Sequence, residues 1–341
     1  MNLQKAESIM EGTATVVKHT GSHYLLAQLP SWRLFPAVLR GKVRLGGSSA
    51  TNPVAVGDRV EFHADGDLLP DGSVPASETA PAAITRILPR RNYIIRKSVN
   101  LSRQAHIIAA NIDHAFIVVT LAFPEVKLPF IDRLLVTCEV YGVKPVIVLN
   151  KIDIVDEFRD DFAPALENFH RIYEGAGYSI LEVSAKTGRG VDELRRLCLE
   201  KSEDGAPGIS LFSGVSGVGK SSLIKAMDPS LNPKTGLISE AHLQGRHTTT
   251  FYEMYPLCGG EGCIIDTPGI RGFGLVDLEP EEISLYFPEM LEAAPDCRFT
   301  PCTHTHEPGC AVKAAVDEGT ISRERYASYL GMLEEYTKYR K

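Results

Sequence analysis

The chain has 341 residues, too many for one ordinary domain, and its 44% hydrophobic and 23% charged content is typical of a globular protein. No apolar run reaches the length of about 20 residues that a membrane-spanning helix needs, and the N-terminus lacks the basic-then-apolar pattern of a secretory signal. We therefore expect a cytoplasmic protein of two or three domains. Because no heptad pattern indicates a coiled coil, we expect a monomer.

The net charge of −7 is unevenly distributed. Residues 1–104 carry a net charge of +5, and the remainder carries −12. Most basic residues of the first part gather in two runs: Arg33, Arg40, Lys42 and Arg44, then Arg86, Arg90, Arg91, Arg96, Lys97 and Arg103. This asymmetry favours contact with a polyanion such as RNA, although a solvated basic face would give the same pattern.

Residues 1–104 read as short strands separated by Gly, Asp and Pro. Their period-two alternation predicts a small antiparallel barrel. The expected strands lie at 12–20, 23–29, 41–45, 58–64 and 82–88. Residues 65–81 are rich in Gly, Asp, Pro and Ser, so we expect a mobile loop there.

From His106 onward, apolar strands alternate with helical segments, which predicts an α/β domain over residues 105–275 with helices on both faces of a parallel sheet. Its strands are expected at 115–120, 146–149, 180–183, 209–212 and 263–265, with residues 250–255 paired to the last strand through the glycine turn at 259–260. Residues 276–341 read as short helices around a cysteine cluster, ending in a helix over 322–339.

A phosphate-binding loop follows the strand at 209–212. Residues 214–221 match G-x-x-x-x-G-K-[ST], and a helix is predicted directly after them. In such a loop the backbone N–H groups surround the phosphates, the lysine contacts the β- and γ-phosphates, and the hydroxyl binds Mg²⁺. This loop does not by itself distinguish ATP from GTP. The residues assigned to it are Gly214, Gly217, Val218, Gly219, Lys220, Ser221 (also the Mg²⁺ ligand) and Ser222.

Two further motifs select guanine. The sequence N-K-I-D at 150–153 ends one strand, at the sheet edge where α/β proteins bind ligands, and S-A-K at 184–186 follows the next. The Asp153 carboxylate can accept both N1–H and the amine of guanine, whereas adenine would leave it unpaired. Asn150 and Lys151 would orient the loop and cover the ring. The base site therefore comprises Asn150, Lys151, Asp153, Ser184, Ala185 and Lys186.

The sequence D-T-P-G at 266–269 fits a D-x-x-G element, in which Asp266 would hold Mg²⁺ through water and the N–H of Gly269 would contact the γ-phosphate. A threonine of the preceding segment 245–250 would complete the Mg²⁺ coordination. Ile270 stands where many GTPases carry glutamine, so His247 is the candidate to position water. The alternative is a histidine that only packs within that segment.

Cys297, Cys302 and Cys310 lie within a stretch of fourteen residues, which in a reducing compartment indicates a metal rather than disulfides. With one histidine they form a complete tetrahedral set for a structural zinc ion. Both His304 and His306 are candidates for the fourth ligand. Unliganded buried cysteines are the alternative, but we do not expect helices this short to bury a core without the metal.

Together these motifs resemble those of Ras-like GTPases, except that N-K-x-D and S-A-K precede the phosphate loop. This order, with an N-terminal barrel and a Cys/His cluster, resembles the circularly permuted family of ribosome small-subunit-dependent GTPase A (RsgA, also called YjeQ) over nearly the whole chain. The resemblance implies an OB-fold in residues 1–104 and zinc-binding helices in 276–341. It also implies these residue roles: zinc ligation by Cys297, Cys302, His304 and Cys310, catalysis by His247, and Mg²⁺ binding by Thr249, with Thr248 as the alternative.

The resemblance further implies a GTPase that is stimulated by the 30S ribosomal subunit, binds 16S rRNA and acts late in assembly of that subunit. Two alternatives remain open: a GTP-dependent switch on tRNA or mRNA, and a non-enzymatic zinc-binding adaptor. The permuted order places both flanking regions next to the D-x-x-G segment, so we expect the γ-phosphate to change the protection of residues 270–275.

Overall fold

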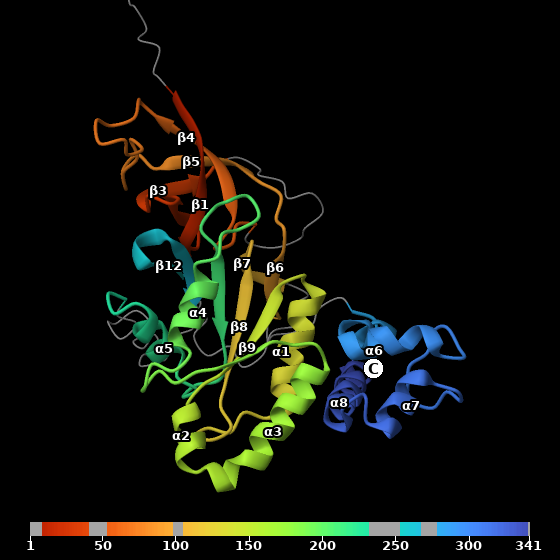
Figure 1. Cartoon of the computed structure of the whole chain (residues 1–341). Coiled ribbons are helices and arrows are strands. Elements are labelled where there is room, and N and C mark those ends of the chain that lie inside the picture. Colours follow the sequence, from red (N-terminus) through yellow and green to blue (C-terminus); the bar gives the residue numbers. More distant parts are fainter. Residues whose placement is uncertain (1–8, 41–52, 98–104, 232–252, 267–277, 340–341) are drawn as a thin grey trace, which may run out of the picture. The chain divides into compact units, whose positions relative to one another are not determined.

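The structure is a computed structural model (Figure 1). It describes residues 9–40, 53–97, 105–231, 253–266 and 278–339. The expected strand at 41–45 and the expected domain boundaries at 104 and 275 lie outside these residues. The chain forms two compact units, one of residues 1–113, 197–211 and 234–267, and one of 114–196, 212–233 and 268–341.

Five strands of the first unit form a closed barrel. They pair in the order β1-β2-β3-β5-β4, and β4 also pairs with β1, which closes the barrel and leaves no free edge between those strands. The predicted barrel is therefore confirmed, but its pairing is not antiparallel throughout, because β3 and β5 run parallel. Its strands are β1 (Ile9–Thr20), β2 (His23–Gln28), β3 (Arg33–Leu39), β4 (Arg59–Asp65) and β5 (Ala82–Ile87).

Strand β3 is the one that the sequence pattern does not predict. It contains Pro36, and proline argues against a strand because it cannot donate a ladder hydrogen bond. Nevertheless, β3 pairs with β2 from Arg33 to Val38, and Phe35 and Ala37 on either side of the proline point into the core. Burial of these two side chains outweighs the missing donor.

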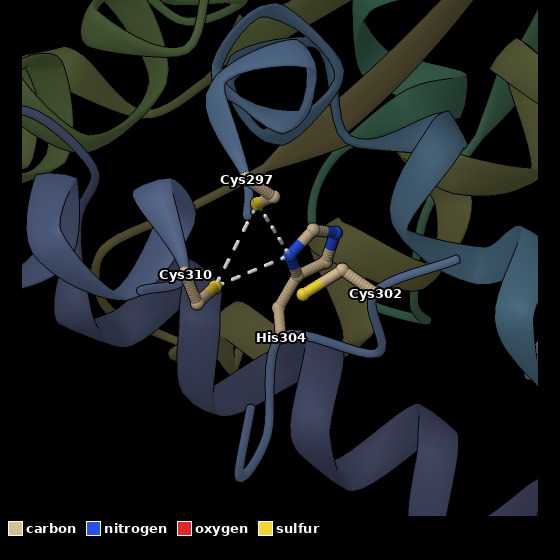
Figure 2. A group of neighbouring side chains, drawn as sticks. All are labelled: Cys297, Cys302, His304 and Cys310. Atoms are coloured by element: carbon tan, nitrogen blue, oxygen red, sulfur yellow. Dashed lines mark hydrogen bonds between the residues drawn. The ribbon is translucent and has the colours of Figure 1, made fainter. Parts of the chain in front are cut away.

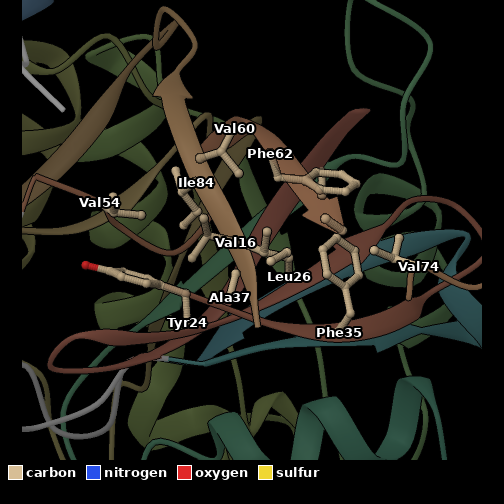
Figure 3. Packing of buried hydrophobic residues seen from close by; sticks show 13 residues of the cluster. Val16, Tyr24, Leu26, Phe35, Ala37, Val54, Val60, Phe62, Val74 and Ile84 are labelled. Carbon is tan, nitrogen blue, oxygen red and sulfur yellow. The ribbon is translucent and has the colours of Figure 1, made fainter. Parts of the chain in front are cut away.

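The barrel core is apolar (Figure 3). The Phe35 and Phe62 rings lie 4.8 Å apart between centroids. The loop at 65–81 adds Val74 to this core, and the Arg33 guanidinium donates to the carbonyl of Gly72 at 2.8 Å. The loop that we expect to be mobile is thus anchored to the barrel at two points. The fully buried side chains of the core include Val16, Leu26, Val60, Phe62 and Ile84.

Two further pairs of strands belong to the first unit, which also includes residues 197–211. Strands β6 (Tyr93–Lys97) and β7 (Ala105–Ala110) pair antiparallel. Strands β12 (Glu253–Leu257) and β13 (Gly262–Asp266) pair antiparallel through the short helix η2 (Cys258–Gly260). The second pair confirms the predicted hairpin around the glycine turn, although residues 250–252 of its expected first strand lie outside the described residues.

The second unit contains the parallel strands, in the order β10-β9-β8. All six residues of β8 are buried, as expected for a strand covered on both faces. The alternation of strands and helices confirms the predicted α/β region. Its elements are β8 (His114–Val119), α1 (Leu128–Val140), β9 (Lys144–Leu149), α2 (Ile152–Glu157), α3 (Arg159–Gly175), β10 (Ile180–Glu182), α4 (Val191–Cys198), β11 (Ile209–Ser213) and α5 (Lys220–Met227).

The C-terminal region is helical, and α8 confirms the helix expected at 322–339. Its core also contains Val136 from α1, and the rings of Phe287 and Tyr329 pack edge to face at 5.8 Å. From the sequence, we expect these short helices to need a metal in order to bury a core. That expectation did not include the contribution of α1. The helices are η3 (Pro280–Tyr286), α6 (Pro288–Ala293), η4 (Ala294–Asp296), α7 (Ala311–Glu318) and α8 (Arg323–Tyr339).

A buried arginine joins this region to α1. Arg325 of α8 is fully buried, and its guanidinium donates to Asp132 at 2.9 Å and to both carboxylate oxygens of Glu289 at 2.7 and 3.0 Å. The guanidinium also lies over the Phe287 ring, 4.7 Å from its centroid. Among the described residues, no helix is both long enough and apolar enough to cross a membrane.

Candidate nucleotide and metal sites

The predicted phosphate loop lies between β11 and α5. Gly214 and Gly219 have positive φ angles of 151° and 96°, a conformation that favours glycine. A Cβ atom would lie 2.3 Å from the Val118 carbonyl oxygen at position 214, and 2.4 Å from Nδ2 of Asn150 at position 219. Both positions therefore require glycine on steric as well as conformational grounds.

Lys220 is the first residue of α5, and its ammonium folds back over the loop. Its Nζ donates to the carbonyl oxygens of Gly214 at 2.6 Å and Val215 at 3.2 Å. The positive charge thus lies at the loop that the motif predicts to hold phosphate. Ser221 and Ser222 follow in the first turn of α5, at the helix end that favours anions.

Asn150 connects the base motifs to the phosphate loop. Its buried side chain donates from Nδ2 to the carbonyl of Val218 at 2.7 Å, and its Oδ1 accepts from the backbone N–H of Ala185 at 3.3 Å. Lys151, next in the chain, adopts a left-handed conformation with φ 63°. Three motifs that are far apart in the sequence therefore meet at one amide side chain.

The Asp153 carboxylate is held by two neighbours. The hydroxyl of the fully buried Ser184 donates to its Oδ1 at 2.6 Å, and Nζ of Lys186 lies 3.7 Å from its Oδ2. Its side chain is 14% exposed, so it stays accessible to a ligand. A carboxylate held in one orientation beside the S-A-K loop can accept the paired N–H groups of a guanine edge.

A loop that the sequence motifs do not include also belongs to this site. Lys151 donates from Nζ to the carbonyl of Phe123, and the Thr120 hydroxyl donates to the carbonyl of Pro124. A Cβ on Gly217 would lie 3.4 Å from Pro124 Cδ, so the loop reaches both the base and the phosphate motifs. Its place at the carboxyl end of β8 is the only sequence signal that could have indicated it.

The residues expected to carry hydrolysis are mostly outside the described part of the chain. Asp266 ends β13, where its backbone is paired with Glu253. His247, Thr248, Thr249, Gly269 and Ile270 lie outside the described residues. Their roles stay predictions.

The Cys/His cluster forms a compact set of donors (Figure 2). The ligand atoms of Cys297, Cys302, His304 and Cys310 all lie within 4.8 Å of one another. His304 Nδ1 is 3.6 Å from the Cys297 sulfur and 3.4 Å from the Cys310 sulfur, and these sulfurs are 3.9 Å apart. Zinc bonds of about 2.3 Å to sulfur and about 2.0 Å to nitrogen give tetrahedral edges of about 3.8 Å between sulfurs and about 3.5 Å between sulfur and nitrogen. The residues present fit a metal such as zinc.

The structure distinguishes the two candidate histidines. His304 is 2% exposed and belongs to the donor set, whereas His306 is exposed and directs its Nδ1 toward the Thr305 hydroxyl at 2.9 Å. Burial lowers the pKa of His304, which favours the neutral imidazole that binds metals. His304 is thus the histidine placed to act as fourth ligand.

Comparison with known proteins finds related GTPases. A model of the RsgA GTPase family matches residues 87–276. The small ribosomal subunit biogenesis GTPase RsgA of Flavobacterium johnsoniae is 46% identical over 322 residues, 94% of this chain and 93% of that protein. The protein of the same name from Bacteroides fragilis is 46% identical over 327 residues, 95% of this chain and 98% of that protein.

Two solved structures share the fold. The crystal structure of YjeQ from Thermotoga maritima has a TM-score of 0.71 and 33% identity, over 96% of this chain and 98% of that chain. The structure of YloQ, a circularly permuted GTPase, has a TM-score of 0.67 and 24% identity, over 100% of this chain and 99% of that chain. The second likeness supports the fold alone.

Proposed function

The chain belongs to the RsgA family of small ribosomal subunit biogenesis GTPases, and we propose that it hydrolyses GTP to GDP and phosphate during late maturation of the 30S subunit, stimulated by that subunit. The observation that supports nucleotide binding most directly is the amide of Asn150, which bonds to both the phosphate loop and the S-A-K loop. One nucleotide could then place its base at Asp153 and its phosphates at Lys220.

The proposed roles combine this geometry with the sequence motifs that lie outside the described residues. Asp153 reads the guanine edge, Lys220 contacts the β- and γ-phosphates, Ser221 and Thr249 bind Mg²⁺, and His247 positions the attacking water. Mg²⁺ would neutralise charge on the phosphates, which is its usual part in such reactions. The remaining contacts are assigned to Asn150, Lys151, Ser184, Ala185, Lys186, Gly214, Gly217, Val218, Gly219, Ser222, Asp266 and Gly269.

Base selectivity tests the proposed pocket. The full-length protein is expected to bind GTP far more tightly than ATP in a titration with fluorescent nucleotides. Asp153→Asn should shift preference toward xanthosine triphosphate, because an amide matches the xanthine edge. The matched control is Asp156→Asn, also in α2, whose carboxylate pairs with Arg189 at the surface. Equal affinity of the unmodified protein for ATP and GTP would remove the basis of this pocket.

The catalytic proposal has a separate test. His247→Ala is expected to keep nucleotide affinity and to lose about 10²–10⁴-fold in turnover, the usual contribution of such a group. The control is His23→Ala, an exposed residue of β2. Single-turnover hydrolysis measures the effect, and an unchanged rate for the His247 variant would exclude the role.

The ribosomal proposal rests on the family and on charge. The net +5 of residues 1–104 suits the phosphates of 16S rRNA, with the barrel as the rRNA-binding part and the cytoplasm as the place of action. Small subunits are expected to raise the GTPase rate, and the stimulation should fall with rising salt. Stimulation by tRNA or mRNA, without any by small subunits, would favour the alternative of a switch on those RNAs.

We also propose one structural zinc ion at Cys297, Cys302, His304 and Cys310. Four protein ligands leave no open position, so this metal would hold the loop between α6 and α7 and take no part in hydrolysis. Metal analysis of the purified protein should find one zinc per chain. A protein that remains folded and contains none would contradict this assignment.

A further inference from the structure

The metal-ligand loop at 302–310 closes around one of its own side chains. Oε1 of Glu307 accepts hydrogen bonds from the backbone N–H and the hydroxyl of Thr303, at 2.8 and 2.6 Å. Its Oε2 accepts from the backbone N–H groups of Thr305 at 3.0 Å and His306 at 3.2 Å. Three N–H groups of a short segment thus converge on one carboxylate, an arrangement that binds anions well.

The carbonyl groups of the same loop are held from another side by α8. The Tyr329 hydroxyl donates to the carbonyl of Thr303, and the Tyr326 hydroxyl donates to that of His304, both at 2.6 Å. His304 itself has a φ of 55°, and for a residue with a side chain this left-handed conformation is unfavourable. Such a conformation persists only where the surroundings hold it.

We propose that Glu307 holds this loop in its metal-binding shape and thereby sets the metal affinity of the Cys/His site without touching the metal. The inference rests on the zinc site proposed above. Hydrogen bonds to a charged acceptor are stronger than neutral ones, so one carboxylate can order the segment that carries His304. A loop ordered beforehand loses less entropy when the metal binds. The four donors around Glu307 also occupy the oxygens that a metal would need.

Zinc affinity of the full-length protein tests the proposal. Glu307→Gln is expected to weaken zinc binding by about 10–100-fold, the usual effect of losing a group that orients metal ligands. The control is Glu318→Gln, which makes the same charge change at the exposed end of α7 and should stay within about twofold of the unmodified protein. Competition with a chromophoric zinc chelator measures both. An unchanged affinity for Glu307→Gln overturns the proposal.

Two further measurements separate positioning from other roles. In the metal-free protein, the amides of Thr305 and His306 should exchange slowly, and in Glu307→Gln they should exchange rapidly. The cobalt-substituted spectrum should be the same in both proteins, because Glu307 is not a ligand. Equal exchange, or a changed cobalt spectrum, contradicts the inference.

A milder variant covers failure to fold. If Glu307→Gln does not fold, Thr303→Val decides. It removes the hydroxyl that donates to Glu307 and contacts the Thr305 hydroxyl, but it keeps the backbone donors to Glu307, so it should weaken zinc binding by a smaller factor. Unchanged affinity in that variant overturns the proposal. If the unmodified protein binds no zinc at all, the zinc assignment itself fails. If the unmodified protein and the variant bind zinc equally well, only the role of Glu307 fails.

Discussion

The barrel and the C-terminal helical region obtain their stability in different ways. In the barrel, hydrogen bonds run between paired strands and the core cluster is apolar, with the buried Asp58–Arg90 ion pair lying outside that cluster. In the C-terminal region, two further features accompany the apolar core. These are the Cys/His cluster of four metal-ligand residues and an arginine buried with two carboxylates. The difference follows from the secondary structure, because short helices satisfy fewer of their own polar groups than a closed barrel does.

This difference has a consequence for substitutions. Shortening an apolar side chain in the barrel leaves a cavity, whose cost depends on its volume. Removing one partner of a buried ion pair instead leaves a charge without compensation, and the cost then depends on pH. The two regions should therefore respond differently to mutation, pH and metal removal.

The largest effect is expected at Arg325. Arg325→Ala leaves Asp132 and Glu289 buried without their cation and should lower the free energy of unfolding by about 3–5 kcal/mol. Burial raises the pKa of Asp132, and the Arg325 charge opposes that rise. Without Arg325 the raised pKa persists, so the penalty should be full at neutral pH and shrink as acid protonates the carboxyl group.

Denaturant unfolding at two pH values measures this prediction. The control is Arg323→Ala, an exposed arginine at the start of the same helix, which should change stability by less than about 0.5 kcal/mol. A loss below about 1 kcal/mol for Arg325→Ala would show that the buried ion pair contributes little, and the comparison between the two regions would fail.

The barrel provides the matching apolar test. Leu26→Ala removes a fully buried side chain and should cost about 2–5 kcal/mol, with no dependence on pH because no ionisable group is exposed or paired by the change. Leu34→Ala, on the neighbouring strand and 48% exposed, is the control and should cost far less. A strong pH dependence of the Leu26 effect would contradict the assignment of the barrel to apolar packing.

Metal removal should affect only one of the two regions. If zinc binds as proposed, a free concentration 100 times the Kd stabilises the protein by about 2.7 kcal/mol, and a chelator removes this contribution. Hydrogen exchange is expected to rise in residues 297–310 and to stay unchanged in β1 and β4. Because α1 contributes Val136 to the helical core, α8 should keep most of its protection. Loss of all helix protection on chelation would show that the metal, not α1, maintains that core.

The smallest effect is expected for a partly exposed ion pair. His170 of α3 contacts Glu174 at 2.9 Å and Glu182 at 3.0 Å. Burial lowers the pKa of His170, but the two carboxylates together raise it by a larger amount. The pKa in the folded protein therefore lies above the ordinary 6.5. The stabilisation is therefore fully present below pH 6.5 and is lost as pH rises through the folded pKa.

His170→Asn measures this contribution. Below pH 6.5 its stability should be lower than that of the unmodified protein by less than ~1 kcal/mol, and the difference should vanish once the pH exceeds the folded pKa of His170. A difference that grows with pH would have the wrong sign for a raised pKa. Both His170 and Arg325 pair with two carboxylates, but only Arg325 is fully buried. The difference between their effects on stability measures how strongly solvent weakens such an ion pair.

The nucleotide motifs illustrate what could be predicted from the sequence. Phosphate binding demands glycines at fixed spacing before a lysine, and guanine selection demands a carboxylate after a strand, so residues 150–153, 184–186 and 214–221 are recognisable locally. The structure brings these segments together through Asn150 and Ser184. Cys297, Cys302 and Cys310 were recognisable for the same reason, because metal ligands impose residue type and short spacing.

Other features depended on contacts between distant parts of the chain. Neither the strand around Pro36, nor the loop at 120–124 beside Lys151, nor the choice of His304 over His306 follows from local pattern. The same holds for Val136 and Asp132 of α1, which complete the C-terminal region from nearly 200 residues away: Arg325 and Asp132 are 193 positions apart.

The sequence by itself determined the chemistry of this protein, since phosphate, guanine and metal ligands each require particular residue types at short spacing. Only the tertiary structure decided which side chains support those groups. Packing and burial depend on which surfaces meet in space, and a side chain such as Arg325 is read as a surface charge until the helices around it are in place.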